Sequence, residues 1–185
     1  MVREGTTSVV PLRCRSPRAL APEDNMSKPP RDFNPSPHQV YFLSIGCSQG
    51  KSIFQSERMA VLFLETLSGY RAQGKFELYE FIVMRNHVHL LVSPGRGVTL
   101  ERAVQFIKGG FSFRAGKELG FKGEIWQRGY VDHRIRDAHD YAYHREYIHM
   151  NPVRAHLCEN SAAFAYSSAN FSHLVDAVPQ GLKPI

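Results

Sequence analysis

The stretch FELYEFIVMRNHVHLLVSP (76–94) decides the fold, because it predicts two strands joined by a tight turn. Its two halves, Phe76–Met84 and His87–Val92, are of strand length and contain the apolar runs Phe81–Met84 and Val88–Val92. The polar pair Arg85-Asn86 separates them, and Pro94-Gly95 ends the second strand. The stretch therefore predicts an antiparallel hairpin.

Strands and helices alternate on both sides of this hairpin. Upstream, the apolar run Val40–Ile45 predicts a strand, and Ser56 opens a helix after it. Downstream, Thr99 caps a second helix, in which Gly109-Gly110 should weaken or bend the helical backbone. The pattern up to this point is strand, helix, two strands and helix.

The C-terminal part of the chain adds one more strand and one more helix. Gly129–Ile135 predicts a strand or extended segment, and Asp137 caps a helix over Ala138–Met150, which Asn151-Pro152 terminates. The order β-α-β-β-α-β-α predicts an α+β domain with a ferredoxin-like split βαβ core. We expect an antiparallel sheet with helices on one face and an additional C-terminal helix.

The composition indicates one domain with flanking tails. The 185 residues suit a single domain, and seven of the eleven prolines fall in residues 1–38, which we expect to be disordered. The compact domain should span 39–170, with an irregular tail over 171–185. No apolar run approaches the ~20 residues that cross a bilayer, and three widely spaced cysteines favour a reducing compartment. We therefore expect a cytoplasmic protein with no membrane partner.

The chain is basic, with a net charge of +6, and the segment 96–136 carries five of these charges. Such a balance favours polyanionic partners such as nucleic acids, although a solvated surface gives the same pattern. Aromatic residues lie among the cations of this segment. Trp126, flanked by Gln127 and Arg128, is the candidate for stacking on a base or contacting a hairpin.

Two histidines in the predicted hairpin form a candidate metal site. His87 and His89 are two residues apart in a strand, so both imidazoles project from one face of the sheet. Two adjacent imidazoles suit a divalent metal ion. The alternative is a half-buried pair that packs against a helix.

A tyrosine and an asparagine share one face of the last predicted helix. Tyr147 and Asn151 are four residues apart, and could present a nucleophile and an oxygen ligand to one site. Pro152 disfavours a helical conformation at Asn151, so the spacing does not guarantee this geometry. Tyr143, one turn earlier, is the other candidate nucleophile. Alternatively, Tyr147 is a core residue.

Three stretches together resemble the REP-associated tyrosine transposases, a group of the single-tyrosine HUH transposases (HUH denotes His-hydrophobic-His). They are FIVMRNHVHLLVSP (81–94), IWQRGYVDHRIRD (125–137) and YIHMNPVRAHL (147–157). This resemblance implies that His87 and His89 are metal ligands, that Tyr147 is the nucleophile, and that Asn151 is a third ligand. The chain departs from the family pattern at Arg85, where Pro is usual, and at His156, where Gly is usual.

The resemblance also implies an activity. Such a protein cleaves and rejoins single-stranded DNA at hairpins such as REP palindromes, through a 5′-phosphotyrosine and with Mg²⁺ or Mn²⁺. It uses no nucleotide cofactor and acts as a monomer or homodimer. The phosphates of the hairpin would be held by the basic segment, notably by Arg102, Lys108, Arg114, Arg128, Arg134 and Arg136.

Other functions remain possible on the sequence alone. A domesticated protein could bind DNA hairpins without cleaving them, although the intact His87, His89 and Tyr147 argue against such decay. A two-histidine phosphoesterase would need a second His-x-Ser/Thr motif, which the sequence lacks. A purely structural protein would show neither metal dependence nor a covalent DNA adduct.

Overall fold

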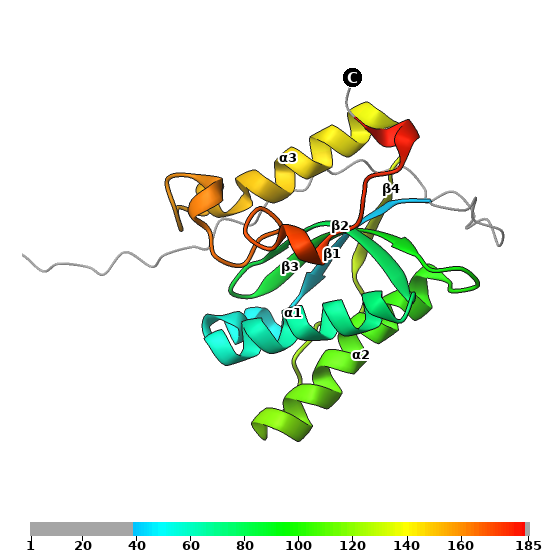
Figure 1. Cartoon of the computed structure of the whole chain (residues 1–185). Coiled ribbons are helices and arrows are strands. Elements are labelled where there is room, and N and C mark those ends of the chain that lie inside the picture. Colours follow the sequence, from blue (N-terminus) through cyan, green and yellow to red (C-terminus); the bar gives the residue numbers. More distant parts are fainter. Residues whose placement is uncertain (1–38, 184–185) are drawn as a thin grey trace, which may run out of the picture. The chain divides into compact units, whose positions relative to one another are not determined.

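A four-stranded antiparallel sheet forms the centre of the computed structural model, which describes residues 39–183 (Figure 1). The predicted disordered tail, 1–38, lies outside the described residues. The strands are β1 (Tyr41–Gly46), β2 (Phe76–Val83), β3 (His87–Pro94) and β4 (Val131–Arg134), in the order β2-β3-β1-β4. The predicted hairpin is therefore β2–β3, which places β3 in the interior of the sheet.

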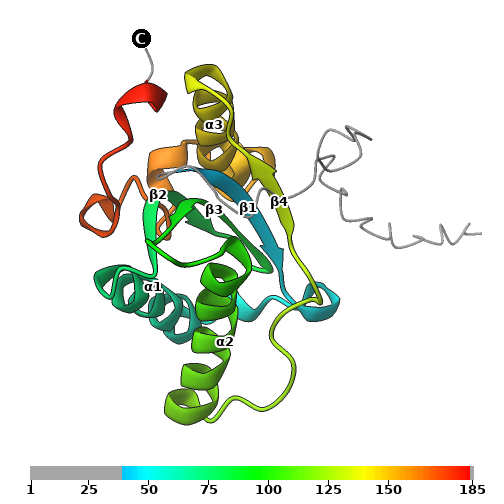
Figure 2. The same cartoon turned by 90° about the vertical axis from the view of Figure 1, so that its right-hand side faces the viewer.

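The three long helices cover both faces of this sheet. In Figures 1 and 2, α1 (Glu57–Ala72) and α2 (Leu100–Leu119) lie on one face and α3 (Ala138–Arg154) on the other. The ferredoxin-like α+β fold is thus confirmed, with the additional helix on the opposite face from the other two. None of the helices within residues 39–183 is long and apolar enough to cross a membrane.

Successive side chains along each strand point to opposite faces of the sheet, and this alternation produces two hydrophobic clusters, one on each face. The larger cluster lies beneath α1 and α2 and includes Val88 and Leu90 of β3. The smaller cluster lies beneath α3 and includes Leu91 of β3 and Ile148 of α3. Because residues i and i+2 of a strand share a face, β3 contributes to both clusters.

The end of α3 differs from the prediction. We expected Asn151-Pro152 to terminate the helix, but it continues to Arg154 with a buried Pro152 inside it. Proline removes only its own N–H bond, and the Ala155 amide still donates to the Asn151 carbonyl at 3.0 Å. His156 then adopts a left-handed φ of 53°, so a non-glycine residue makes the turn that glycine usually makes. Asn151 therefore has a helical backbone.

The segment that follows α3 covers the outer edge of β2. The Val83 amide donates to the Tyr166 carbonyl at 2.9 Å, and the Ser168 amide donates to the Phe81 carbonyl at 3.0 Å. Residues 171–183, which we expected to be irregular, contain two single-turn 3-10 helices. The backbone groups at this edge of the sheet are thus paired within the chain.

Glu80 anchors α3 to the sheet. This residue of β2 is 8% exposed, and its carboxylate accepts hydrogen bonds from three side chains. Arg145 and His149 of α3 donate at 2.7 and 3.0 Å, and Ser168 donates at 2.5 Å. Burial raises the pKa of Glu80, but these hydrogen bonds outweigh it, so the pKa lies below its ordinary value. A buried carboxylate therefore holds α3 in place as an anion.

Gly110 permits the close packing of α1 against α2. A Cβ atom at Gly110 would lie 2.2 Å from the ring of Tyr70 on α1, and this ring also packs against Phe106, with 5.1 Å between ring centroids. At Gly109, a Cβ would meet nothing nearer than 4.0 Å. The helix runs through both glycines without interruption. The two neighbouring glycines therefore differ in function.

We predict opposite effects for alanine at these two positions. Gly110→Ala should destabilise the fold by about 1–2 kcal/mol, because Tyr70 must move. Gly109→Ala should leave stability unchanged or raise it by up to about 1 kcal/mol, because alanine is the better helix former. Urea denaturation of both variants measures the difference. Equal stabilities would show that the Tyr70 ring moves aside without cost.

We also predict a pH-dependent cost for Glu80→Gln. At neutral pH the loss of charged hydrogen bonds should destabilise the fold by about 2 kcal/mol. A carboxyl with a lowered folded-state pKa stabilises the fold above its unfolded pKa, near 4.5, and that contribution falls as the pH drops through the folded value. The difference between wild type and variant should therefore shrink below pH 4.5.

Denaturation midpoints at pH 7.5, 5.5 and 4 test this expectation. Glu146→Gln, which removes an exposed carboxylate from the same helix, serves as the control and should change stability by less than about 0.5 kcal/mol. A cost for Glu80→Gln that stays constant down to pH 4 would contradict the anchoring role of the carboxylate.

Candidate functional site

The two histidines of β3 point toward the face that α3 covers. Val88 and Leu90 fill the opposite cluster, so His87 and His89 must share the α3 side. Their ring centroids are 4.7 Å apart. The predicted pair thus exists as a pair, on an interior strand that fixes its position.

α3 brings Tyr147 and Asn151 onto this pair. The rings of Tyr147 and His89 lie 5.3 Å apart between centroids. The side chain of Asn151 interacts with both His87 and Tyr147. Because α3 continues past Pro152, Tyr147 and Asn151 lie one helical turn apart on one face. The four residues predicted from separate stretches therefore meet in space, and their roles remain predictions.

The environment of the histidines fits a divalent metal ion. His89 is 4% exposed, and neither of its ring nitrogens has a hydrogen-bond partner among the described residues. Burial and the neighbouring His87 hold the pKa of His89 well below its usual value, and burial also lowers the pKa of His87. Neutral imidazoles are the form that binds metals. A buried ring nitrogen without a hydrogen-bond partner lowers the stability of the fold by about 1–3 kcal/mol, and coordination of a metal ion by that nitrogen would offset this loss.

Asn86 orients His87, a contact that the sequence analysis did not anticipate. The Oδ1 atom of Asn86 lies 2.7 Å from Nδ1 of His87. Because an amide oxygen only accepts, Nδ1 is the donor, and this leaves the lone pair of Nε2 for a ligand. An oxygen that fixes the imidazole tautomer is the usual support for a metal-binding histidine.

Tyr147 lies between aromatic and cationic neighbours. Its ring packs edge-on against Phe42, at 5.8 Å between centroids, and the guanidinium of Arg154 lies 5.7 Å from the ring centroid. Burial raises the pKa of the Tyr147 phenol, and Arg154 opposes that increase. Arg154 was missed because the predicted helix ended before it. Its seven-residue spacing from Tyr147, two helical turns, was the available signal.

Tyr143 occupies a different environment. Its side chain is 52% exposed, and its ring contacts His144, at 5.3 Å between centroids. Between the two candidate nucleophiles on α3, Tyr147 is the one whose ring packs against His89.

Trp126 is not a surface residue, which corrects the expectation that it stacks on a base. The side chain is 6% exposed and packs in the larger cluster against Phe54, Phe63 and Phe111. Its indole Nε1 donates to the Lys108 carbonyl at 3.0 Å. Sequence proximity to Arg128 suggested exposure, but the apolar ring is buried instead. Neither face of the ring is open to a base.

The predicted phosphate-binding cations do not gather at the histidine pair. Those of α2 lie on the other side of the sheet from α3 (Figure 2). Lys108 Nζ donates to the carbonyls of Gln127 and Gly129 at 2.9 and 2.8 Å, which ties the loop before β4 to the helix. Arg114 pairs with Glu65 and Glu118 at 2.9 and 2.6 Å. These two cations therefore have structural partners.

The remaining predicted cations lie near β4 or at the start of α2. Arg102 donates to Gln105 at 2.6 Å, and Arg134 donates to Oε1 of Gln39 at 2.7 Å. Arg136 lies 3.2 Å from Asp140 at the start of α3, and Arg128 is exposed in the loop before β4. These four cations are spread over several elements. The structure does not assign them a common ligand.

Known proteins resemble this chain in sequence and fold. It is 29% identical over 103 residues to a provisionally named REP-associated tyrosine transposase of Haemophilus influenzae, covering 50% of this chain and 58% of that protein. It is 27% identical over 111 residues to the REP-associated tyrosine transposase of Escherichia coli K12, covering 60% and 61%. The chain thus spans less than two thirds of either relative.

The fold matches a solved structure, described as a REP-associated tyrosine transposase bound to a REP hairpin. The TM-score is 0.65 at 19% identity, covering 86% of this chain and 95% of that one. A family model described as "Transposase IS200 like" matches residues 40–151, a stretch that contains His87, His89, Tyr147 and Asn151. The chain therefore belongs to the IS200-like transposase family.

Proposed function

We propose that this protein cleaves and rejoins single-stranded DNA at hairpins, with Tyr147 as the nucleophile. The observation that carries the proposal is the contact of Tyr147 with a buried His89 whose ring nitrogens have no hydrogen-bond partner within residues 39–183. The family assignment supports it, as does the solved relative bound to a REP hairpin. We expect a similar hairpin to be the substrate, and the oligomeric state to be monomeric or dimeric.

Covalent catalysis accounts for both cleavage and rejoining. The Tyr147 Oη would attack the scissile phosphorus and form a 5′-phosphotyrosine as the bond from phosphorus to the 3′-oxygen breaks. The phenol proton leaves to solvent, and the leaving 3′-oxygen takes a proton from solvent to become a 3′-hydroxyl. Attack by a 3′-hydroxyl on the phosphotyrosine reverses these bond changes, so rejoining requires no nucleotide cofactor. The phosphotyrosine ester replaces the broken ester to the 3′-oxygen, and so conserves its bond energy until the ends are rejoined.

His87, His89 and Asn151 would hold the divalent ion, Mg²⁺ or Mn²⁺. When bound, the ion supplies positive charge to the non-bridging oxygens of the scissile phosphate. The protein supplies the remaining requirements. Burial raises the pKa of the Tyr147 phenol, and Arg154 opposes this increase and favours the phenolate as the proton leaves. Asn86 keeps His87 in the tautomer that can act as a ligand.

We predict that Tyr147→Phe abolishes the covalent protein–DNA adduct and retains hairpin binding, since a single hydroxyl is lost. Tyr143→Phe is the matched control, one turn earlier on the same helix, and should still form the adduct. Denaturing gels of each variant with labelled single-stranded hairpins and Mn²⁺ measure the adduct. Peptide mapping that places the DNA on Tyr143, or on no tyrosine, would overturn the assignment.

Removal of either imidazole should separate cleavage from binding. His87→Ala and His89→Ala should both abolish cleavage, as should EDTA, while hairpin affinity changes by less than about tenfold, because phosphate contacts supply most of it. Nicking assays and binding titrations at one salt concentration measure the two effects. Hairpin binding without any cleavage by the wild type would instead favour a domesticated, cleavage-inactive protein.

A further inference from the structure

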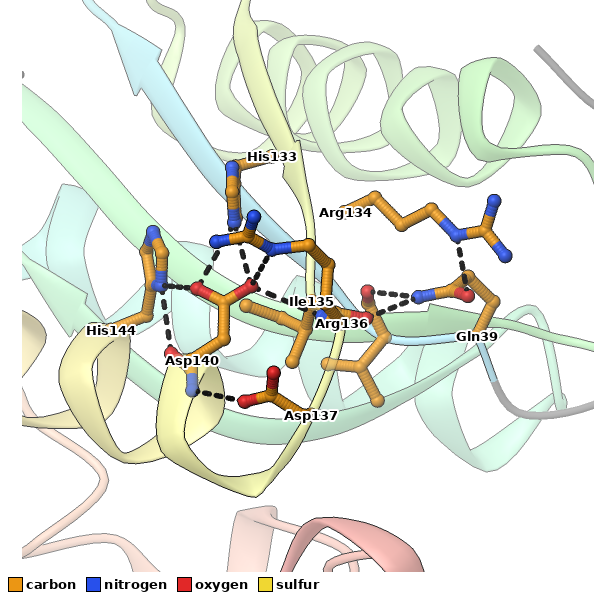
Figure 3. A network of polar contacts seen from close by, with 9 residues as sticks. Gln39, His133, Arg134, Ile135, Arg136, Asp137, Asp140 and His144 are labelled. Carbon is orange, nitrogen blue, oxygen red and sulfur yellow. Dashed lines mark hydrogen bonds and ion pairs between the residues drawn. The ribbon is translucent and has the colours of Figure 1, made fainter. Parts of the chain in front are cut away.

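A second group of metal-binding side chains lies at the junction of β4 and α3. Within residues 39–183, His133, Asp140 and His144 each offer a ligand atom, and these atoms lie within 4.8 Å of one another. Figure 3 shows both imidazoles directed at the Asp140 carboxylate. Asp140 is 7% exposed. The sequence analysis did not identify this group, because the three residues come from two elements.

The spacing within the group approaches that of ligands around one ion. Nε2 of His133 is 2.9 Å from Asp140 Oδ2, and Nδ1 of His144 is 3.1 Å from Oδ1. Tetrahedral ligands about 2.0–2.1 Å from an ion are themselves about 3.3 Å apart. Small rotations of the side chains would therefore admit an ion, and two imidazoles with one carboxylate are a common zinc ligand set.

The charge states of the group also suit a metal. Burial raises the pKa of Asp140, but hydrogen bonds from His133 and from the Arg136 backbone outweigh it and hold the pKa below its usual value. Burial lowers the pKa of His144. An ionised carboxylate and a neutral imidazole are the forms that bind metals, and both shifts are in that direction.

The Arg136 guanidinium lies beside the carboxylate that an ion would bind. Its Nε lies 3.2 Å from Asp140 Oδ2, and its side chain is 74% exposed, so it can turn out into solvent. The His133 side chain is 39% exposed, which leaves a route for an ion and a water ligand. Two backbone groups also form hydrogen bonds within the group. The Arg136 amide donates to Asp140 Oδ2 at 3.1 Å, and the Asp140 carbonyl accepts from His144 Nδ1 at 2.9 Å. Binding must displace some of these bonds.

We propose that His133, Asp140 and His144 bind a divalent transition-metal ion of the class that prefers imidazole nitrogen, such as Zn²⁺. This site is separate from the His87–His89 pair, because β1 lies between β3 and β4. The Phe42 ring of β1 contacts both His144 and His89, at 4.9 and 5.3 Å between centroids. The bound ion would join β4 to the first two turns of α3 and stabilise the helix that carries Tyr147. The proposal does not depend on DNA cleavage.

Zinc binding in the absence of the first histidine pair tests the proposal. In the full chain carrying His87→Ala and His89→Ala, calorimetric titration should show one equivalent of Zn²⁺, and Mg²⁺ should give no signal. At a Zn²⁺ concentration one hundred times the Kd, the Tm should rise by about 5–10 °C.

Further substitutions in this background locate the ion. His133→Ala and Asp140→Asn should each abolish the titration and the Tm shift, and His133→Ala is the variant expected to fold, because its side chain is the more exposed. Arg136→Gln, which removes the competing guanidinium, should strengthen Zn²⁺ binding severalfold. Absence of saturable Zn²⁺ binding, or binding that His133→Ala leaves unchanged, would show that the group is a hydrogen-bonded anchor only.

Discussion

The two-residue period of β3 is the constraint on which the site depends. One strand in the interior of the sheet sends Val88 and Leu90 into the core beneath α1 and α2, and it presents His87 and His89 to the opposite side. A shift in register by one residue would bury the imidazoles in the apolar core and expose the aliphatic side chains. The energy of core packing therefore also fixes the position of the histidine pair.

The other half of the site depends on how α3 is held. The apolar cluster beneath this helix is the smaller of the two, and polar anchors supplement it at both ends. Glu80 binds the C-terminal half through Arg145 and His149, and Asp140 binds β4 through His133. Directional bonds to buried carboxylates define the position of a helix more closely than apolar contacts alone, so electrostatics fixes the position of Tyr147.

Short-range periodicity predicted the fold and the two separate pairs, His87 with His89 and Tyr147 with Asn151. The family resemblance implied that these pairs meet at one site. Sequence reasoning failed where tertiary packing overrides local preference. Pro152 is tolerated inside α3, so Arg154 joins the surroundings of Tyr147. Trp126 is buried because its ring fills space between distant phenylalanines. The group of His133, Asp140 and His144 could not be predicted, because hydrogen bonds between different elements produce no periodic pattern in the sequence.

The covered edge of β2 has a consequence for how copies of the protein can meet. The segment after α3 pairs with Phe81 and Val83, so among the described residues β4 is the edge of the sheet that lacks a neighbouring strand. β4 is only four residues long and alternates charged side chains, Asp132 and Arg134, on one face. Short, charged edges resist pairing with another chain. Both edges of the sheet, at β2 and at β4, therefore resist the strand pairing between copies that leads to aggregates.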